Sequence, residues 1–217
     1  MDNRNENEIT ETEVTEATVI ETETAAPAKK KQSSAKSTAS SIFDIIEMFA
    51  ICTAVILLLF SYAARLTVVE GESMENTLYG GDYLVVHNIA YTPTRGDIVV
   101  IHKISAPTYH NPIIKRVIGV AGDTVDIDFD TWTVYVNGEA IDEPYANFEP
   151  GRIYSDLVFP LTVEEGTVFV LGDHRNYSAD SRVAQLGLID ERCIVGRAVL
   201  RVLPFDHFGV MERAKYE

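Results

Sequence analysis

The stretch NPIIKRVIGVAGDTV, residues 111–125, indicates a β-strand that carries two cations among apolar side chains. Side chains alternate between the two faces of a strand, so Lys115 shares a face with Ile113 and Val117. Arg116 lies on the opposite face, and one of the two cations must therefore face apolar neighbours. Either the strand lies at a sheet edge and the lysine amine reaches water, or the amine is desolvated and kept neutral.

The chemistry of the two cations makes Lys115 the candidate base. An arginine stays protonated because its pKa is above about 12, whereas burial can lower the pKa of a lysine by several units from about 10.4. A pKa of about 8 corresponds to a cost of about 3 kcal/mol, which a single site can sustain. A neutral lysine can take a proton from a serine hydroxyl and deliver it later to a leaving amine, the work that histidine does in a triad.

Two other stretches contain candidate partners for this lysine. GESMENTL, residues 71–78, contains Ser73, which by itself is either a turn hydroxyl or a nucleophile. VLGDHRNYSADSR, residues 170–182, follows an apolar run and is dense in hydrogen-bonding groups. It is either an ordinary polar turn with a surface ion pair or a loop that holds the serine and Lys115 in register.

Most of the remaining sequence after residue 83 indicates short strands. Runs rich in β-branched residues recur between turn signals, at residues 83–88, 97–104, 113–123, 124–129, 131–141, 167–173 and 193–204. Asn137 and Gly138 stand between extended flanks, which is a strong hairpin signal. We expect a mainly β domain over residues 65–217, with a coiled antiparallel sheet or a barrel-like arrangement.

An apolar segment precedes this domain and predicts one transmembrane helix. Residues 48–64 carry no charge, and extension back to Ile42 gives a span of 42–64, within the usual range of about 17 to 25 residues. Asp44 and Glu47 then lie near the interfacial end, where acids cost less than at the bilayer centre.

The charges that flank this segment predict its orientation. Four lysines lie within residues 29–36 and only Arg65 closely follows, which favours a cytoplasmic amino terminus and an extracytoplasmic domain. A cleavable signal peptide is the alternative, since Ser61 and Ala63 are spaced like a cleavage site. The length of the apolar stretch and of the preceding tail favours the anchor, and self-cleavage at this site is left open.

The amino-acid composition limits the classes of protein and the kinds of partner that remain possible. A chain of 217 residues with 46% hydrophobic residues can bury a substantial core, and its net charge of −15 argues against a nucleic-acid partner. Residues 1–41, first acidic and then basic, predict a disordered cytoplasmic tail. Cys52 and Cys193 offer no disulfide framework, and the histidines show no ligand spacing, so we expect no metal and no cofactor.

The stretches GESM, GDYLVV, KRVIG and GDHRNYSADSR, in this order after an anchor helix, resemble the bacterial type I signal peptidases of the serine–lysine class. The resemblance covers most of the chain after Ile42. It implies that Ser73 is the nucleophile and Lys115 the general base. It also implies that the Ser178 hydroxyl orients the lysine.

Further implications of the resemblance concern the surroundings of the dyad. Asp180 and Arg182 are implied as a structural ion pair, and the Ser73 backbone N–H as one donor of an oxyanion hole. Some members of the family place a hydroxyl residue two positions before the nucleophile, where this chain has Gly71. The second donor is therefore left open.

The chain also departs from the usual family pattern at three positions. Asn76 stands where proline is usual, Ala121 where GVPGD is commoner, and His174 where GDNR is usual. None of these positions is the serine or the lysine. We expect His174 to retain a structural role through hydrogen bonding.

The function implied is that of a membrane-anchored endopeptidase that removes signal peptides from exported preproteins through an acyl-enzyme. Its expected partners are these preproteins and the lipid bilayer, and its oligomeric state is left open. One alternative is a self-cleaving serine–lysine repressor, although this chain has a membrane segment in place of a DNA-binding module. The other is a non-catalytic anchored β domain that binds surface partners.

Overall fold

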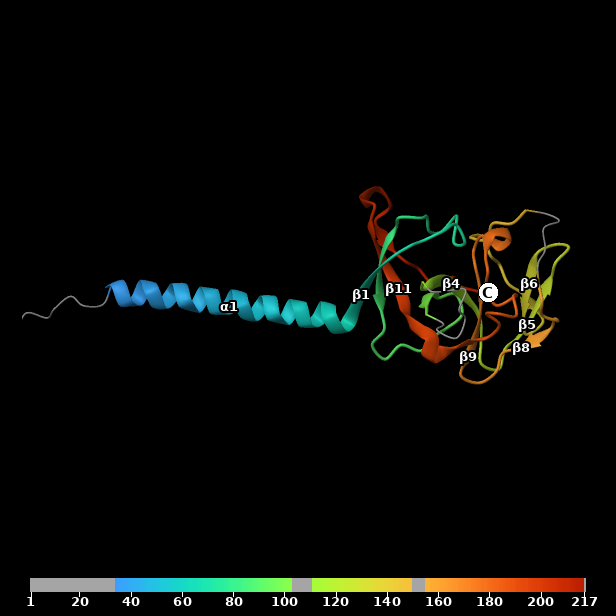
Figure 1. Ribbon diagram of the computed structural model, residues 1–217, viewed down its shortest axis with the longest axis horizontal. Helices are drawn as coiled ribbons and strands as arrows, with labels where there is room; N and C mark the ends of the chain where they lie inside the picture. Colours follow the sequence, from blue (N-terminus) through green and yellow to red (C-terminus); the bar gives the residue numbers. More distant parts are fainter. Residues whose placement is uncertain (1–33, 103–110, 150–154, 217) are drawn as a thin grey trace, which may run out of the picture. The chain divides into compact units, whose positions relative to one another are not determined.

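The computed structural model describes residues 34–102, 111–149 and 155–216. The contacts of the chain divide it into two units, with the boundary between Met48 and Phe49. The predicted disordered tail falls largely on residues 1–33, which lie outside the described residues. The folded domain is mainly β and antiparallel, which confirms the expected fold class (Figure 1).

A long helix, α1, runs from Ser34 to Ala63. Residues 40–58 within it have a mean hydropathy of 2.2, and none of that window is buried, so the segment is long and apolar enough to cross a membrane. The helix begins eight residues before the predicted span, because residues 34–41 contain no helix breaker and continue the same hydrogen-bonded turns. It ends one residue earlier than predicted, where strand β1 begins at Ala64.

The strands form two sheets with the order β1-β2-β11-β3-β4-β9-β10 in the larger and β7-β6-β5-β8 in the smaller. A short strand, β12 (Gly209–Val210), also pairs with β11. The larger sheet contains β1 (Ala64–Val68), β2 (Tyr83–His87), β3 (Ile98–Ile101), β4 (Ile113–Val120), β9 (Thr167–Leu171), β10 (Ile189–Asp190) and β11 (Ile194–Leu203). The smaller contains β5 (Thr124–Asp128), β6 (Thr133–Val136), β7 (Glu139–Ala140) and β8 (Leu161–Thr162). Three single-turn 3-10 helices complete the described elements, at Arg175–Tyr177, Glu191–Cys193 and Phe205–His207.

Strand β4 lies inside the larger sheet, between β3 and β9. Both cations of this strand are buried, with only 3% of Lys115 and 3% of Arg116 exposed. The edge-strand interpretation of Lys115 is therefore wrong. Neither face of the strand opens to water at these two positions, so each cation needs a compensating environment inside the protein.

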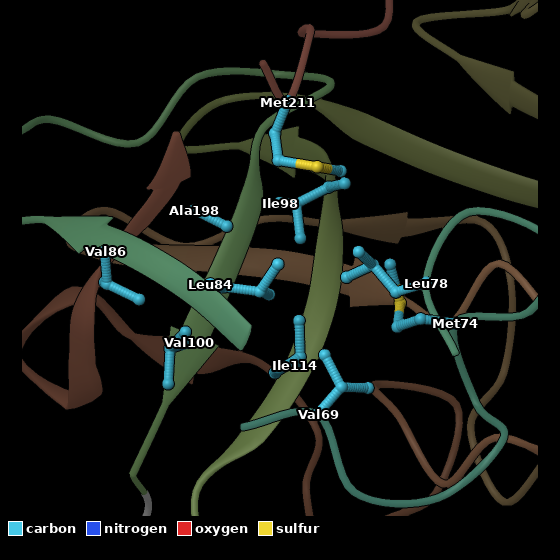
Figure 2. Close-up of a cluster of buried hydrophobic side chains, with 10 residues drawn as sticks. All are labelled: Val69, Met74, Leu78, Leu84, Val86, Ile98, Val100, Ile114, Ala198 and Met211. Atoms are coloured by element: carbon cyan, nitrogen blue, oxygen red, sulfur yellow. The ribbon is translucent and has the colours of Figure 1, made fainter. Parts of the chain in front are cut away.

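One of the hydrophobic clusters anchors the segment that carries Ser73. Met74 and Leu78 are 1% and 0% exposed and pack in a cluster that also contains Val69 and Ile114 (Figure 2). Burial of a side chain of this size contributes about 1.5–3 kcal/mol. The buried side chains of Met74 and Leu78 thus attach the Ser73 segment to the hydrophobic core. Tyr79, which follows them, remains 42% exposed.

The Asn-Gly pair forms the predicted hairpin between β6 and β7. Asn137 and Gly138 have φ values of 56° and 84°, and Val136 pairs with Glu139 across the turn. Two successive residues with positive φ are the conformation that a two-residue hairpin loop requires. The sequence signal and the structure agree here because the turn is entirely local.

The carboxyl-terminal segment packs against the turn that precedes β3. Gly96 has a φ of 84°, and its carbonyl accepts hydrogen bonds from the Ala214 N–H at 3.2 Å and from Arg116 Nη1 at 3.1 Å. A Cβ atom on Gly96 would lie 2.0 Å from the Ala214 carbonyl oxygen. Only glycine fits here, because of both the backbone conformation and the close approach of another main chain.

Gly96→Ala is expected to destabilise the protein far more than Gly138→Ala. The two glycines share a φ of 84°, but a Cβ on Gly138 would meet nothing within 4 Å. Gly138→Ala should cost only the left-handed conformational penalty of about 1–2 kcal/mol. Gly96→Ala should cost at least about 2 kcal/mol more because the Ala214 backbone must move. Thermal unfolding of the full chain in detergent, followed by circular dichroism, measures both, and equal losses would contradict this account.

Candidate active site

Ser73 and Lys115 lie in contact although 42 residues separate them. Ser73 is in the connection between β1 and β2, and Lys115 is on β4. Lys115 Nζ is 2.7 Å from Ser73 Oγ and also donates a hydrogen bond to the Ile114 carbonyl at 2.9 Å. This is the distance at which a proton can pass directly between an amine and a hydroxyl.

Burial lowers the pKa of Lys115 from 10.5 to about 8. Asp180 and Asp173 oppose this shift by favouring the charged amine, and Arg182 adds to it. Neither acid forms an ion pair with Lys115 among the described residues. The desolvation of the amine therefore outweighs the carboxylates, and the amine becomes neutral near pH 8.

Asp180 and Arg182 form the ion pair that the family resemblance implies, and it is buried. Arg182 Nε lies 2.8 Å from Asp180 Oδ1, and Nη2 lies 2.8 Å from the other carboxylate oxygen. Asp180 also accepts a hydrogen bond from the Gly172 N–H at 3.0 Å. Burial raises the pKa of Asp180, but the guanidinium more than offsets this and lowers it overall. The alternative of a surface pair is wrong, because both side chains are buried.

Ser178 lies beside the backbone of the nucleophile segment. Its Oγ is buried, and no hydrogen bond joins it to Lys115, so its orienting role stays a prediction. A Cβ on Gly172 would lie 2.2 Å from Ser178 Oγ and 2.5 Å from the Ser73 carbonyl oxygen. The absence of a side chain at Gly172 is thus what allows the two serine segments to approach.

Gly71 precedes this contact on the nucleophile side. It is exposed, has a φ of 81°, and a Cβ there would meet nothing within 4 Å. The positive φ is a conformation that glycine adopts without strain. The position therefore contributes a turn to the site, and it has no side chain that could donate to an oxyanion.

Asp173 joins the nucleophile segment to the base strand, a role that the sequence analysis missed. Arg116 donates to both carboxylate oxygens of Asp173, at 2.8 Å and 2.6 Å. Thr77, four residues after the serine, donates its hydroxyl to Asp173 Oδ2. Charge-assisted, bidentate bonds of this kind are among the strongest that a protein makes. The signal available in the sequence was an acid, Asp173, two residues after the end of the apolar run that forms β9.

A second set of contacts supports Arg116 from its other side. The guanidinium lies 3.8 Å from the centre of the Tyr145 ring, a favourable cation–π distance. The Tyr145 hydroxyl donates to Glu143 at 2.8 Å and lies 2.8 Å from the Tyr216 hydroxyl. Glu143 in turn forms an ion pair with Arg175. No local pattern predicts these contacts, because their members come from distant parts of the chain.

His174 also contributes to the site, mainly through its backbone. Its N–H donates to the Ser73 carbonyl at 3.1 Å, which ties the loop to the nucleophile segment. The His174 ring packs against the Tyr177 ring at a tilt of 46°, with centroids 4.5 Å apart, and Nδ1 is 3.7 Å from a Glu75 carboxylate oxygen. The position has the structural role that we expected, although the ring contributes through packing on Tyr177, whereas the prediction relied on hydrogen bonding by the side chain.

Metal-ligating side chains do not gather at this site or elsewhere in the described ranges. No group of three or more His, Cys, Asp or Glu side chains there could hold a metal ion. The chemistry available at the site is that of a hydroxyl beside a desolvated amine.

A serine hydroxyl against a buried lysine amine, on an antiparallel β scaffold, is the arrangement of serine–lysine hydrolases. The family model described as signal peptidase, peptidase S26, matches residues 42–203. The signal peptidase I of Bacillus licheniformis is 34% identical over 177 residues, which cover 77% of this chain and 91% of that protein. The signal peptidase IB of Staphylococcus aureus strain COL is 33% identical over 184 residues, which cover 77% and 92%.

A crystal structure of a signal peptidase I from Enterococcus faecalis V583 is 30% identical, and the match covers 50% of this chain and 98% of that one, with a TM-score of 0.41. On the family match and the two relatives, the chain belongs to the peptidase S26 family of signal peptidases. It is accordingly a serine endopeptidase that cleaves signal peptides. The resemblance noted from the sequence is confirmed.

Replacement of Lys115 by methionine should stabilise the protein near neutral pH, and the gain should shrink as the pH rises. In the parent, the unfolded lysine titrates near 10.5 and the folded one near 8. Between these values the unfolded state binds more protons, so the parent gains stability as the pH rises, by about 3 kcal/mol in total. Urea unfolding of both proteins from pH 7 to pH 10.5 measures the difference. A pH-independent difference would show that Lys115 is not desolvated.

Proposed function

We propose that Ser73 is the nucleophile and Lys115 the general base with which this chain cleaves signal peptides. The contact of 2.7 Å between Ser73 Oγ and the buried Lys115 Nζ carries the proposal. An amine with a pKa of about 8 is partly neutral at physiological pH and can accept the hydroxyl proton.

The proposed reaction has two halves that use the same pair of groups. Lys115 takes the proton of Ser73 Oγ while the oxygen bonds to the carbonyl carbon of the scissile peptide. As the carbon–nitrogen bond breaks, Lys115 returns the proton to the leaving amine, and an ester on Ser73 remains. Lys115 then takes a proton from water, which attacks the ester, and the released hydroxyl of Ser73 recovers it. The Ser73 N–H is proposed to stabilise the oxyanion.

The surrounding ion pairs are proposed to hold this geometry. Asp173 connects Thr77 of the nucleophile segment to Arg116 of the base strand. Asp180 and Arg182 support the loop that contains Ser178. Such residues hold the reacting atoms in position, and small displacements of these atoms slow catalysis strongly.

The membrane placement forms part of the same proposal. Residues 42–64 are proposed as the anchor, residues 1–41 as a cytoplasmic tail and residues 65–217 as the outer domain, on the lysines that precede the helix. Six of the exposed large apolar side chains of the domain lie on strands β1 and β2 and around β12, at Leu66, Val68, Tyr83, Phe205, Phe208 and Val210, and the others that the structure describes lie in connecting segments, at Tyr79, Ile89, Phe148, Val158 and Tyr177. Leu66 follows the helix by three residues, so the chain keeps it close to the lipid surface. Exported preproteins would reach the site along this surface with their signal segment still in the bilayer.

Lys115→Arg should abolish cleavage of a preprotein although it conserves charge and approximate length. A guanidinium remains protonated at any usable pH and cannot accept the serine proton. We expect a loss of at least about 100-fold, the lower bound for general-base catalysis. The parent should gain kcat/KM as the pH rises through about 8, because the base is then neutral. The measurement is a pH profile of preprotein cleavage by the detergent-solubilised full chain.

Arg116→Lys is the matched control, and Ser73→Ala the catalytic one. Arg116→Lys keeps a cation next to Asp173 but loses the bidentate contact, so its rate should fall while the pH at half-maximal rate stays near 8. Ser73→Ala should be inactive at every pH. Circular dichroism confirms that each variant is folded. If folded Lys115→Arg retained more than about a hundredth of the parental activity, Lys115 would not be the base.

The amino terminus should be retained and cytoplasmic. An epitope tag before residue 1 should be protected when protease is added to intact spheroplasts, and a tag after residue 217 should be removed, since the lysines before the span favour this orientation. The intact mass of the membrane-isolated protein tests retention. A species that begins at Ala64 would show that the chain is cut after Ala63 and would contradict the anchor.

A further inference from the structure

A pocket of about 450 Å³ lies on the loop side of the dyad. The residues that line it include Asp156, Tyr177, Ser178 and Gln185. Most of them belong to the connection between β9 and β10, which begins directly after Leu171. The pocket is thus built mainly by the loop that also supplies the Asp180–Arg182 ion pair.

The pocket adjoins the nucleophile through Ser178. The Ser178 Oγ is buried without a hydrogen-bond partner, and it meets the Ser73 carbonyl oxygen across Gly172, as the close approach at that glycine shows. The pocket therefore lies close to Ser73, within reach of residues on one side of a scissile bond held there. An extended peptide advances about 3.3 Å per residue, so only the first few residues beside the cleaved bond can reach it.

The order of the strands indicates whether the residues before or after the cleaved bond lie toward the pocket. In the strand order, β1, β2 and β11, with β12 beside it, lie on one side of β4, and β9 and the loop that follows it lie on the other. The first side carries a group of six exposed apolar side chains on β1 and β2 and around β12, whereas the exposed apolar residues near the pocket are Val158 and Tyr177. The signal segment of a preprotein is apolar and remains in the bilayer, and it ends in small residues at the cleavage site. The signal segment therefore matches the side of β4 on which β1, β2 and β12 present their apolar side chains. The pocket lies on the opposite side, and five of its seven lining residues have a polar or charged group, with Ala179 and Val183 as the apolar ones, so it suits the residues that follow the cleaved bond.

The charge of the pocket wall indicates which kind of side chain the pocket would bind. Asp156 is the one lining residue with a charged side chain at neutral pH among those that the structure describes. It is exposed, and its backbone N–H donates to the Arg182 carbonyl at 3.0 Å, while Oδ2 accepts from the Ala184 N–H at 3.1 Å. These bonds hold the carboxylate in place, and the neighbouring Asp180 is already neutralised by Arg182.

We propose that this pocket binds the side chain of one of the first three residues of the mature protein, and that Asp156 makes it prefer a cationic side chain over an acidic one. The inference rests on the proposed catalytic role of Ser73. It assigns to the loop of residues 172–188 a part in substrate selection, in addition to its support of the dyad.

The test uses one preprotein in which the first, second or third residue after the cleaved bond is Lys or Glu. The full chain in detergent is assayed for kcat/KM at low salt, and the ratio of the Lys to the Glu substrate is compared among four enzymes. These are the parent, Asp156→Asn, Asp156→Lys and Asp130→Asn, the last an exposed acid outside the pocket. A ratio does not depend on how much of each enzyme is folded.

At one of the three positions, the parent should cleave the Lys substrate about two- to fivefold faster than the Glu substrate, as exposed charge pairs allow. The ratio should approach one in Asp156→Asn, fall below one in Asp156→Lys and stay at the parental value in Asp130→Asn. It should also fall at high salt. A parental ratio of one at all three positions, or a ratio unchanged in Asp156→Asn, would overturn the inference. Either result leaves the proposed function intact, because that function is tested separately by the loss of cleavage in Ser73→Ala and Lys115→Arg.

Discussion

The desolvation of one amine is the constraint on which the rest of the site depends. Lys115 needs burial to become neutral near physiological pH, yet Asp173 and Asp180 lie close enough to favour its charged form. Each of these acids is bound by an arginine, Asp173 by Arg116 and Asp180 by Arg182. The two ion pairs neutralise the acids locally, so that desolvation determines the pKa of the lysine. The buried charges around the dyad thus keep the lysine usable as a base.

The same ion pairs also bring together three segments that lie far apart in the chain. Asp173 binds the nucleophile segment through Thr77 and the base strand through Arg116. Gly172, next to it, has no side chain and so allows the loop to approach the Ser73 carbonyl. Removal of one partner from such a buried pair would leave an uncompensated charge, which is among the costlier changes in a protein. Stability and catalytic geometry therefore depend on the same contacts.

Support for the site extends beyond the part of the chain that the family model matches, which ends at residue 203. Ala214 packs on Gly96, Arg213 binds Asp97 at 2.8 Å, and Tyr216 reaches Tyr145, which lies under Arg116. The final residues thus cover the face of β4 opposite to the lysine. This cover helps to keep Arg116 buried and in contact with Asp173.

Sequence patterns by themselves determined the β class, the apolar helix, the hairpin at Asn137 and Gly138, and the separation of Lys115 and Arg116 onto two faces of one strand. Each of these follows from local spacing or from backbone preferences of a few neighbouring residues. The meeting of Ser73 with Lys115 was inferred through family resemblance, since their separation of 42 residues has no local signature.

Only the tertiary structure decided what lies on each face of β4. Alternation predicts which side chains point the same way, but burial depends on strands and loops that pack there from elsewhere in the chain. For this reason the edge-strand alternative stayed open until β3 and β9 were seen on either side, and the partners Asp173, Tyr145 and Tyr216 were not foreseen. A desolvated lysine is a property of its three-dimensional surroundings, which residues distant in the sequence create together.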